Sequence, residues 1–185
     1  MSAPTAAELL ALQEALYASK NPTRRWLHVT RRDWVVEAIR RFSDESGRAL
    51  EVGPGSGVYL PELAATGGQV IAADIEEAYL EQARALAESE PRLSVVCDDI
   101  TATQLPEGSY QLVLCTEVIE HIADSEAALA GLARLVSDDG VLILTTPQKF
   151  SPLELCARIA FLPGIIQLVK LIYREPVSYT HLRAH

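Results

Sequence analysis

The sequence predicts an α/β fold in which a parallel sheet is flanked by helices, and two observations support this. Short apolar runs that suit buried strands lie at residues 49–52, 70–73, 93–97, 111–115 and 141–145. Between several of these runs, the segments 59–65, 76–88 and 125–136 have the apolar spacing of helices. Regular alternation of strands and helices is typical of a parallel sheet with right-handed crossovers, which place all strand carboxyl ends at one edge.

A helical region precedes the first strand. Leu9, Leu12 and Leu16 recur at helical spacing and predict a helix over 5–18. Asn21-Pro22-Thr23 interrupts the pattern, and a second helix is expected from about Thr23 or Thr30 to Phe42. We expect these two helices to cap the sheet.

The length of 185 residues suits one structural domain, which we divide into four segments. We expect residues 1–48 to form a helical cap, 49–150 the core, 151–177 an apolar helical lid or pocket wall, and 178–185 a non-native or disordered tail. Charged residues and Pro163-Gly164 interrupt the apolar part of the third segment, which therefore does not suit a membrane span. Core packing and peripheral membrane contact are the alternatives for it.

Composition narrows the classes of partner. A formal net charge of −9 argues against binding a nucleic-acid backbone, which needs a clustered basic surface. Arginine pairs at 24–25, 31–32 and 40–41 are interpreted as a solvated helix face, with an anionic substrate or partner as the alternative. Cysteines at 97, 115 and 156 form no metal-type pair, and residues 1–20 lack the pattern of a secretory signal. A cytoplasmic location is expected, and the oligomeric state is not indicated.

A glycine-rich turn follows the first predicted strand, in the stretch Glu51-Val52-Gly53-Pro54-Gly55-Ser56-Gly57. Glycines at alternate positions let the backbone bend sharply and approach a bound molecule. Asp74 ends the next strand roughly 20 residues later, where a carboxylate can bind both hydroxyls of a ribose. The dinucleotide fingerprint requires a further glycine at position 58, which is Val58 here. A nucleotide-like cofactor other than a dinucleotide is therefore indicated.

Four blocks in order, 51–57, 73–75, 97–100 and 110–121, resemble the class I S-adenosylmethionine-dependent methyltransferases. Within that family they are similar to the small-molecule branch that includes the quinone-biosynthesis enzymes (methyltransferase type 11). The resemblance covers about residues 48–148. It implies a Rossmann-like fold, S-adenosyl-L-methionine as cofactor, and methyl transfer to a small acceptor. The apolar segment near the C-terminus favours an apolar acceptor.

The resemblance also implies a set of cofactor-binding residues. The glycine loop would border the methionine part, with Glu51 organising the loop or contacting the amino group through water. Asp74 would hold the ribose, Ile75 would pack on the adenine, and Asp99 would accept from its exocyclic amine, with Ile100 alongside. Cys115 would offer a backbone carbonyl. The set is Glu51, Gly53, Gly55, Gly57, Asp74, Ile75, Asp99, Ile100 and Cys115.

The cluster Glu117-Val118-Ile119-Glu120-His121 allows three interpretations. His121 can act as a general base, because imidazole titrates near neutral pH. Glu117, Glu120 and His121 can together hold a divalent metal, as in some quinone O-methyltransferases. Alternatively His121 packs at the start of the next helix and Glu117 lines the cofactor pocket. This last interpretation is the main expectation, so no metal is predicted. No basic residue is strictly required for the reaction either, because the sulfonium of the cofactor already activates the methyl group.

One departure from the family bears on activity. Such methyltransferases carry an antiparallel hairpin after the fifth strand, and no alternating apolar run follows Thr145 here. The expectation is a truncated chain. A cofactor-binding but inactive or partner-dependent subunit is therefore an alternative function. A nicotinamide-dependent oxidoreductase is a second alternative, and Val58 argues against it.

Overall fold

The computed structural model describes residues 6–147, and its centre is a five-stranded sheet in the order β3-β2-β1-β4-β5. All neighbouring strands pair in parallel. The strands are β1 (Arg48–Val52), β2 (Gln69–Asp74), β3 (Leu93–Cys97), β4 (Tyr110–Thr116) and β5 (Val136–Thr145). The order reverses between β1 and β4, which is the place where open α/β sheets bind ligands. The predicted fold class is confirmed.

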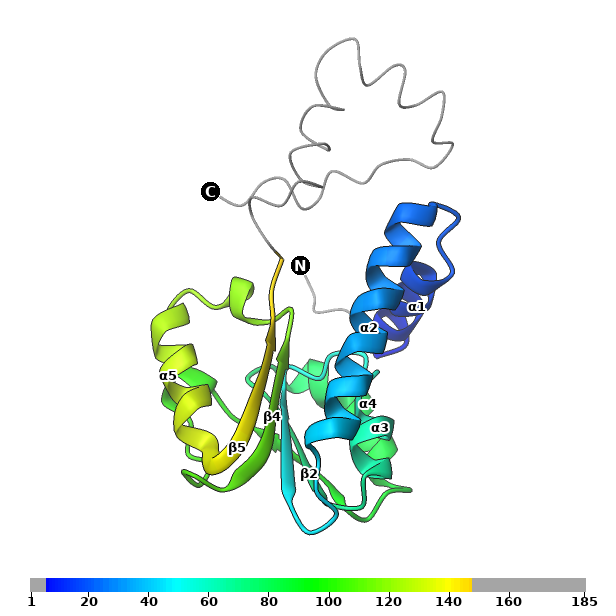
Figure 1. The fold of residues 1–185 in the computed structure, drawn as a ribbon. Helices are drawn as coiled ribbons and strands as arrows, with labels where there is room; N and C mark the ends of the chain where they lie inside the picture. The colour runs from blue at the N-terminus through cyan, green and yellow to red at the C-terminus, as the bar shows by residue number, and fades with distance from the viewer. Residues whose placement is uncertain (1–5, 148–185) are drawn as a thin grey trace.

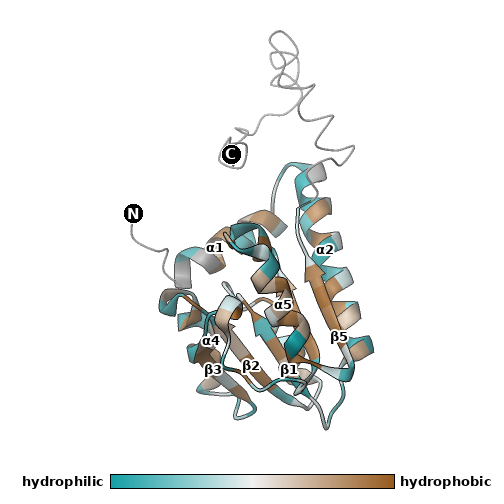
Figure 2. Ribbon diagram, turned by 90° about the vertical axis from the view of Figure 1, so that its left-hand side faces the viewer, coloured by the Kyte–Doolittle hydropathy of each residue, from teal (hydrophilic) through white to brown (hydrophobic). Residues whose placement is uncertain are grey.

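Helices cover both faces of the sheet (Figure 1). One face packs against α2 (Pro22–Phe42), α3 (Leu60–Ala65) and α4 (Glu81–Ala87), and the other against α5 (Ser125–Leu135). Short 3₁₀ helices stand at η1 (Glu77–Leu80), η2 (Ile100–Ala102) and η3 (Ile119–His121). Side chains alternate between the two faces along each strand, so Ala49 lies in the core of the first face and Leu50 in that of the second. The strands form the apolar centre of the molecule (Figure 2).

The N-terminal region contains α1 (Ala6–Tyr17) and α2, which begins at Pro22, next to the earlier of the two predicted starts. Pro22 is tolerated as the first helical residue because it lacks the N–H that a helix start leaves unpaired. The Asn21 side chain accepts from the Arg24 N–H at 3.2 Å and caps the helix. Only the second half of α2 covers the sheet, through residues such as Val35 and Ile39, while α1 packs against α2. The predicted cap is thus provided by part of one helix.

The junction between α5 and β5 differs from the prediction. The helix ends at Leu135, and Val136 already pairs with Tyr110. Regular pairing resumes where Val141 meets Leu112, so the residues between form an irregularity in the strand. A Cβ at Gly140 would lie 2.8 Å from the Tyr110 carbonyl oxygen, which explains a glycine in this close turn. The sequence Asp138-Asp139-Gly140 therefore interrupts strand pairing inside β5, which begins before the run predicted at 141–145.

Two expectations concern residues that the structure does not describe. The lid at 151–177 and the tail at 178–185 lie outside the described residues, as does any hairpin after β5. Within residues 6–147, no helix combines the length and apolar character that crossing a membrane requires.

Candidate functional site

The predicted cofactor-binding residues follow neighbouring strands at the carboxyl edge of the sheet. Val52 of β1 pairs with Ala73 of β2 on one side and with Cys115 of β4 on the other. The Gly53 N–H donates to the Ala73 carbonyl at 2.8 Å, and the Asp98 N–H donates to the Asp74 carbonyl at 3.0 Å. The loops after β1, β2 and β3 are therefore held side by side, as predicted.

The glycine loop uses left-handed backbone at all three glycines, with φ of 71° at Gly53, 50° at Gly55 and 69° at Gly57. Only glycine adopts this conformation without strain. A Cβ at Gly53 would lie 2.3 Å from Cγ2 of Val118, whereas one at Gly55 would meet no atom within 4 Å. Gly53 is thus required by packing against the loop after β4, and Gly55 leaves open space that a ligand can approach.

Glu51 carries the least expected environment of the site. Its side chain is 1% exposed, and among the described residues its Oε2 has no hydrogen-bond partner. Burial raises the pKa of this carboxyl from an ordinary 4.5 to about 8. A buried polar atom without a partner is costly, so its retention here calls for an explanation. A cationic ligand group beside the glycine loop provides one, and the site therefore fits a cofactor with a positively charged methionine part.

Asp74 lies half-buried at the end of β2. Its Oδ1 accepts the Glu76 N–H at 2.8 Å, which fixes the direction of the carboxylate. Burial raises the pKa of Asp74, and the hydrogen bond from Glu76 opposes that rise. Ile75 follows with 60% exposure, so an apolar side chain faces solvent beside the carboxylate. This pair suits a ribose and the adjoining base.

The two acids after β3 hold the following loop. Asp99 accepts both the N–H and the hydroxyl of Thr101 on Oδ1, at 2.9 and 2.8 Å, and so caps η2. Asp98 accepts the Gln104 N–H on Oδ2 at 3.0 Å. Ile100 is 7% exposed and belongs to the core on the α5 face. It therefore supports the loop from beneath, and its contact with the adenine stays a prediction.

Cys115 is buried in the core between β1 and β5. Burial raises the pKa of its thiol to about 12, so the sulfur stays protonated at neutral pH. Any cofactor contact from this residue is therefore expected from its backbone rather than from thiolate chemistry.

The cluster after β4 is fixed by contacts with β5 and α2. Glu117 has a φ of 56°, which is strained for a residue with a side chain. Its N–H donates to the Thr145 carbonyl at 2.9 Å, and its Oε1 accepts from the Thr145 hydroxyl at 3.3 Å. Glu120 accepts from Thr146 at 3.4 Å, and His121 is exposed. Within residues 6–147 no three histidine, cysteine or acidic side chains gather in a way that could hold a metal ion.

Sequence reasoning missed the role of Arg31. Its guanidinium forms an ion pair with Oε2 of Glu117, with side-chain exposures of 32% and 28%. Arg31 also donates to Nδ1 of His28 at 3.0 Å, and burial together with this arginine lowers the pKa of His28. The arginine pair at 31–32 was visible in the sequence, but a solvated helix face is wrong for Arg31. The contact joins residues far apart in sequence, and no local pattern signals it.

Comparisons with known proteins show the family to which the chain belongs. The family described as "Methyltransferase domain" matches residues 50–144, and the chain belongs to this family. A mitochondrial ubiquinone biosynthesis O-methyltransferase of Schizosaccharomyces pombe is 32% identical over 130 residues, 66% of this chain and 47% of its own. The ubiquinone biosynthesis O-methyltransferase of Pseudomonas aeruginosa is 32% identical over 117 residues, 62% of this chain and 49% of its own. The chain thus spans about half the length of these relatives.

Solved structures share the fold. A SAM-dependent methyltransferase from Aquifex aeolicus superimposes with a TM-score of 0.56 at 18% identity, covering 86% of this chain and 85% of that one. The sheet is therefore the Rossmann-like sheet of class I methyltransferases, and S-adenosyl-L-methionine is the cofactor that family and fold imply.

Proposed function

We propose that the protein transfers a methyl group from S-adenosyl-L-methionine to an oxygen of a small, apolar acceptor. The observation that carries the proposal is the buried Glu51, whose Oε2 has no hydrogen-bond partner within residues 6–147. It lies beside glycines with left-handed backbone, at the same sheet edge as Asp74. The likeness to relatives named O-methyltransferases supports oxygen as the accepting atom. The apolar sequence after residue 150 supports an apolar acceptor.

The chain's own residues would bind and orient the cofactor. Glu51 would face the ammonium group, and its carboxyl would give up its proton when that cation arrives. Asp74 would accept from the ribose hydroxyls, while Ile75 and Asp99 would contact the adenine. The cofactor supplies a methyl group on a sulfonium, and the neutral thioether that would remain after transfer is a good leaving group. Orientation of the acceptor against that methyl can contribute roughly 7 kcal/mol or more.

His121 remains the proposed general base. Its imidazole is exposed at the end of η3, as the last residue of the cluster that follows β4. A base here would take the proton of an acceptor hydroxyl, a contribution of about 10²- to 10⁴-fold. His121→Ala is therefore expected to lower kcat far more than it changes the affinity for the cofactor, and single-turnover kinetics would separate the two.

Binding and turnover are tested separately. Calorimetry with S-adenosylhomocysteine and with NAD asks which cofactor is bound, and binding of NAD alone would contradict the proposal. Incubation with radiolabelled donor and phenolic acceptors, followed by extraction into organic solvent, asks for an apolar product. Binding without product over a panel of acceptors would favour the cofactor-binding but inactive or partner-dependent subunit.

We also propose a cytoplasmic location. Cys97 and Cys115 are free thiols in the structure, and Cys97 is exposed, which suits a reducing compartment. Fractionation of cells followed by immunodetection would test it.

A further inference from the structure

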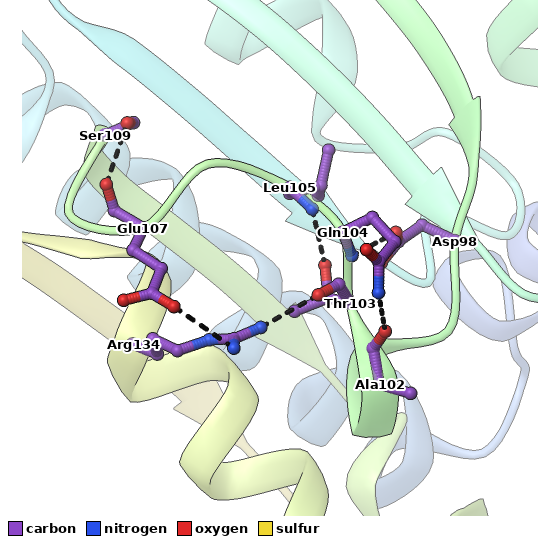
Figure 3. A network of polar contacts seen from close by, with 8 residues as sticks. All are labelled: Asp98, Ala102, Thr103, Gln104, Leu105, Glu107, Ser109 and Arg134. Carbon is purple, nitrogen blue, oxygen red and sulfur yellow. Dashed lines mark hydrogen bonds and ion pairs between the residues drawn. The ribbon is translucent and has the colours of Figure 1, made fainter.

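The loop between β3 and β4, residues 98–109, begins with Asp98 and with Asp99, the acid that the proposed function assigns to the adenine. Its first half is closed by its own side chains (Figure 3). Asp98 accepts from the Gln104 N–H at 3.0 Å, and the Thr103 hydroxyl accepts from the Leu105 N–H at 3.1 Å. Thr103 itself is 4% exposed. These hydrogen bonds therefore join residues 98–105 into one connected unit.

Helix α5 holds this unit through Arg134 (Figure 3). The guanidinium donates from Nη2 to the Thr103 carbonyl at 2.8 Å, and Nη1 lies 3.2 Å from Oε1 of Glu107. The end of the helix is also hydrogen-bonded to the end of the loop, because the Gly108 N–H donates to the Arg134 carbonyl at 2.9 Å. One arginine thus links three points along the loop.

The same helix touches the beginning of the loop at Gly131. A Cβ at this position would lie 2.1 Å from the carbonyl oxygen of Ile100, so a side chain would displace the backbone next to Asp99. Gly131 stands almost one helical turn before Arg134. Together they fix both the distance and the orientation of the loop relative to α5.

We infer that Arg134 and Gly131 are positioning residues for adenine recognition, acting through the loop that carries Asp99. The inference rests on the proposed function. Because Asp99 directs Oδ1 to the N–H and hydroxyl of Thr101, its carboxylate turns with the loop backbone. A change in the loop therefore moves the acceptor that would meet the exocyclic amine of the base.

The experiment compares two ligands that differ at that amine. S-adenosylhomocysteine carries it, and S-inosylhomocysteine has an oxygen in its place. We expect Arg134→Met to raise the Kd for S-adenosylhomocysteine about tenfold, because the Thr103 carbonyl loses a charged hydrogen-bond donor. The Kd for S-inosylhomocysteine should rise much less. Glu107→Gln keeps the Thr103 contact and should change neither Kd more than about twofold, since exposed ion pairs contribute little. Arg92→Met is the matched control, because Arg92 pairs with Glu90 before β3.

Each outcome decides the inference. The deciding quantity is the Kd for S-inosylhomocysteine divided by the Kd for S-adenosylhomocysteine. A lower value of this ratio in Arg134→Met, with an unchanged value in Arg92→Met, supports the inference. An unchanged ratio, or equal weakening of both ligands, overturns it while the proposed function stands. Failure of the unsubstituted protein to bind S-adenosylhomocysteine overturns both.

A second variant guards against loss of folding. Arg134→Lys keeps the charge but cannot reach both Thr103 and Glu107 with a planar fork, so we expect a smaller shift in the same direction. Hydrogen exchange in the ligand-free protein should show faster exchange at Leu105 and Gly108 in both variants. Unchanged exchange at these amides together with an unchanged Kd ratio in Arg134→Lys overturns the inference.

Discussion

Glu51 is a residue whose burial lowers the stability of the folded protein, although the proposed function uses it to bind the cofactor. Its carboxyl is buried without a partner for Oε2 among the described residues, and its pKa is raised to about 8. The unfolded chain releases this proton near pH 4.5, whereas the folded protein keeps it. Between these values the folded state binds more protons, so stability falls as pH rises and levels off above about 8.

The first prediction follows from that sign. Between pH 5 and 8, the Glu51 carboxyl should lower the free energy of unfolding of the unsubstituted protein by up to about 1.4 kcal/mol per pH unit. Glu51→Gln should lack this decline, because its amide does not titrate. Urea unfolding of both proteins at four pH values measures it. Parallel stability curves for the two proteins would contradict the assigned burial of the charge.

Asp74 gives a prediction about binding alone. Asp74→Ala should raise the Kd for S-adenosylhomocysteine about 100-fold, because the ribose hydroxyls lose a charged hydrogen-bond acceptor. Stability should change little, since this half-buried carboxylate accepts only from the neighbouring backbone, at Glu76 and Ile75, among the described residues. Calorimetry measures the affinity, and circular dichroism checks the fold. Asp74→Asn, which can still accept from Glu76, is the matched variant.

Two glycines of one loop should respond differently to alanine. Gly53→Ala combines strained backbone with a collision against Val118 and should cost about 2 kcal/mol or more of stability. Gly55→Ala places its methyl in open space, so the expected cost is about 1 kcal/mol from the backbone, with a clear loss of cofactor affinity. Thermal unfolding and calorimetry distinguish them. Equal stability of the two variants would show that the Val118 contact is unimportant.

At the scale of elements, the ion pair between Arg31 and Glu117 ties α2 to the end of β4. We expect Arg31→Met or Glu117→Gln to lower stability by only about 1 kcal/mol, as is usual for a partly exposed pair. The first half of α2 should then exchange its amide hydrogens faster, while β1 and β4 keep their protection. Arg24→Met, on the exposed side of the same helix, is the control. Equal exchange in all three variants would contradict a tie between the two elements.

The elements were also the most predictable level of the structure. Apolar runs located all five strands, because a buried parallel strand must be apolar on both faces. The glycine turn and Asp74 were predictable because their chemistry depends on residues close in sequence. Arg31 with Glu117, Val118 against Gly53, and Arg134 with Thr103 were not, since each contact joins segments that only the fold brings together.

On the scale of the whole molecule, charge and apolar surface are unevenly distributed. The chain carries −9 overall, yet α2 has arginines near its start, middle and end. The same helix also exposes Trp26, at 64%, and Trp34, at 56%. The net charge gives only an average, whereas the arginine pairs at 24–25, 31–32 and 40–41 already indicated where basic residues gather.

Both tryptophans of the chain therefore stand outside the hydrophobic core. Intrinsic fluorescence of the native protein should already resemble that of indole in water, and denaturant should shift its emission only slightly while far-ultraviolet ellipticity collapses. A native spectrum shifted strongly to the blue would contradict the exposure of these rings. For this protein, tryptophan emission therefore reports on molecules that bind to α2, whereas unfolding has to be followed by another signal.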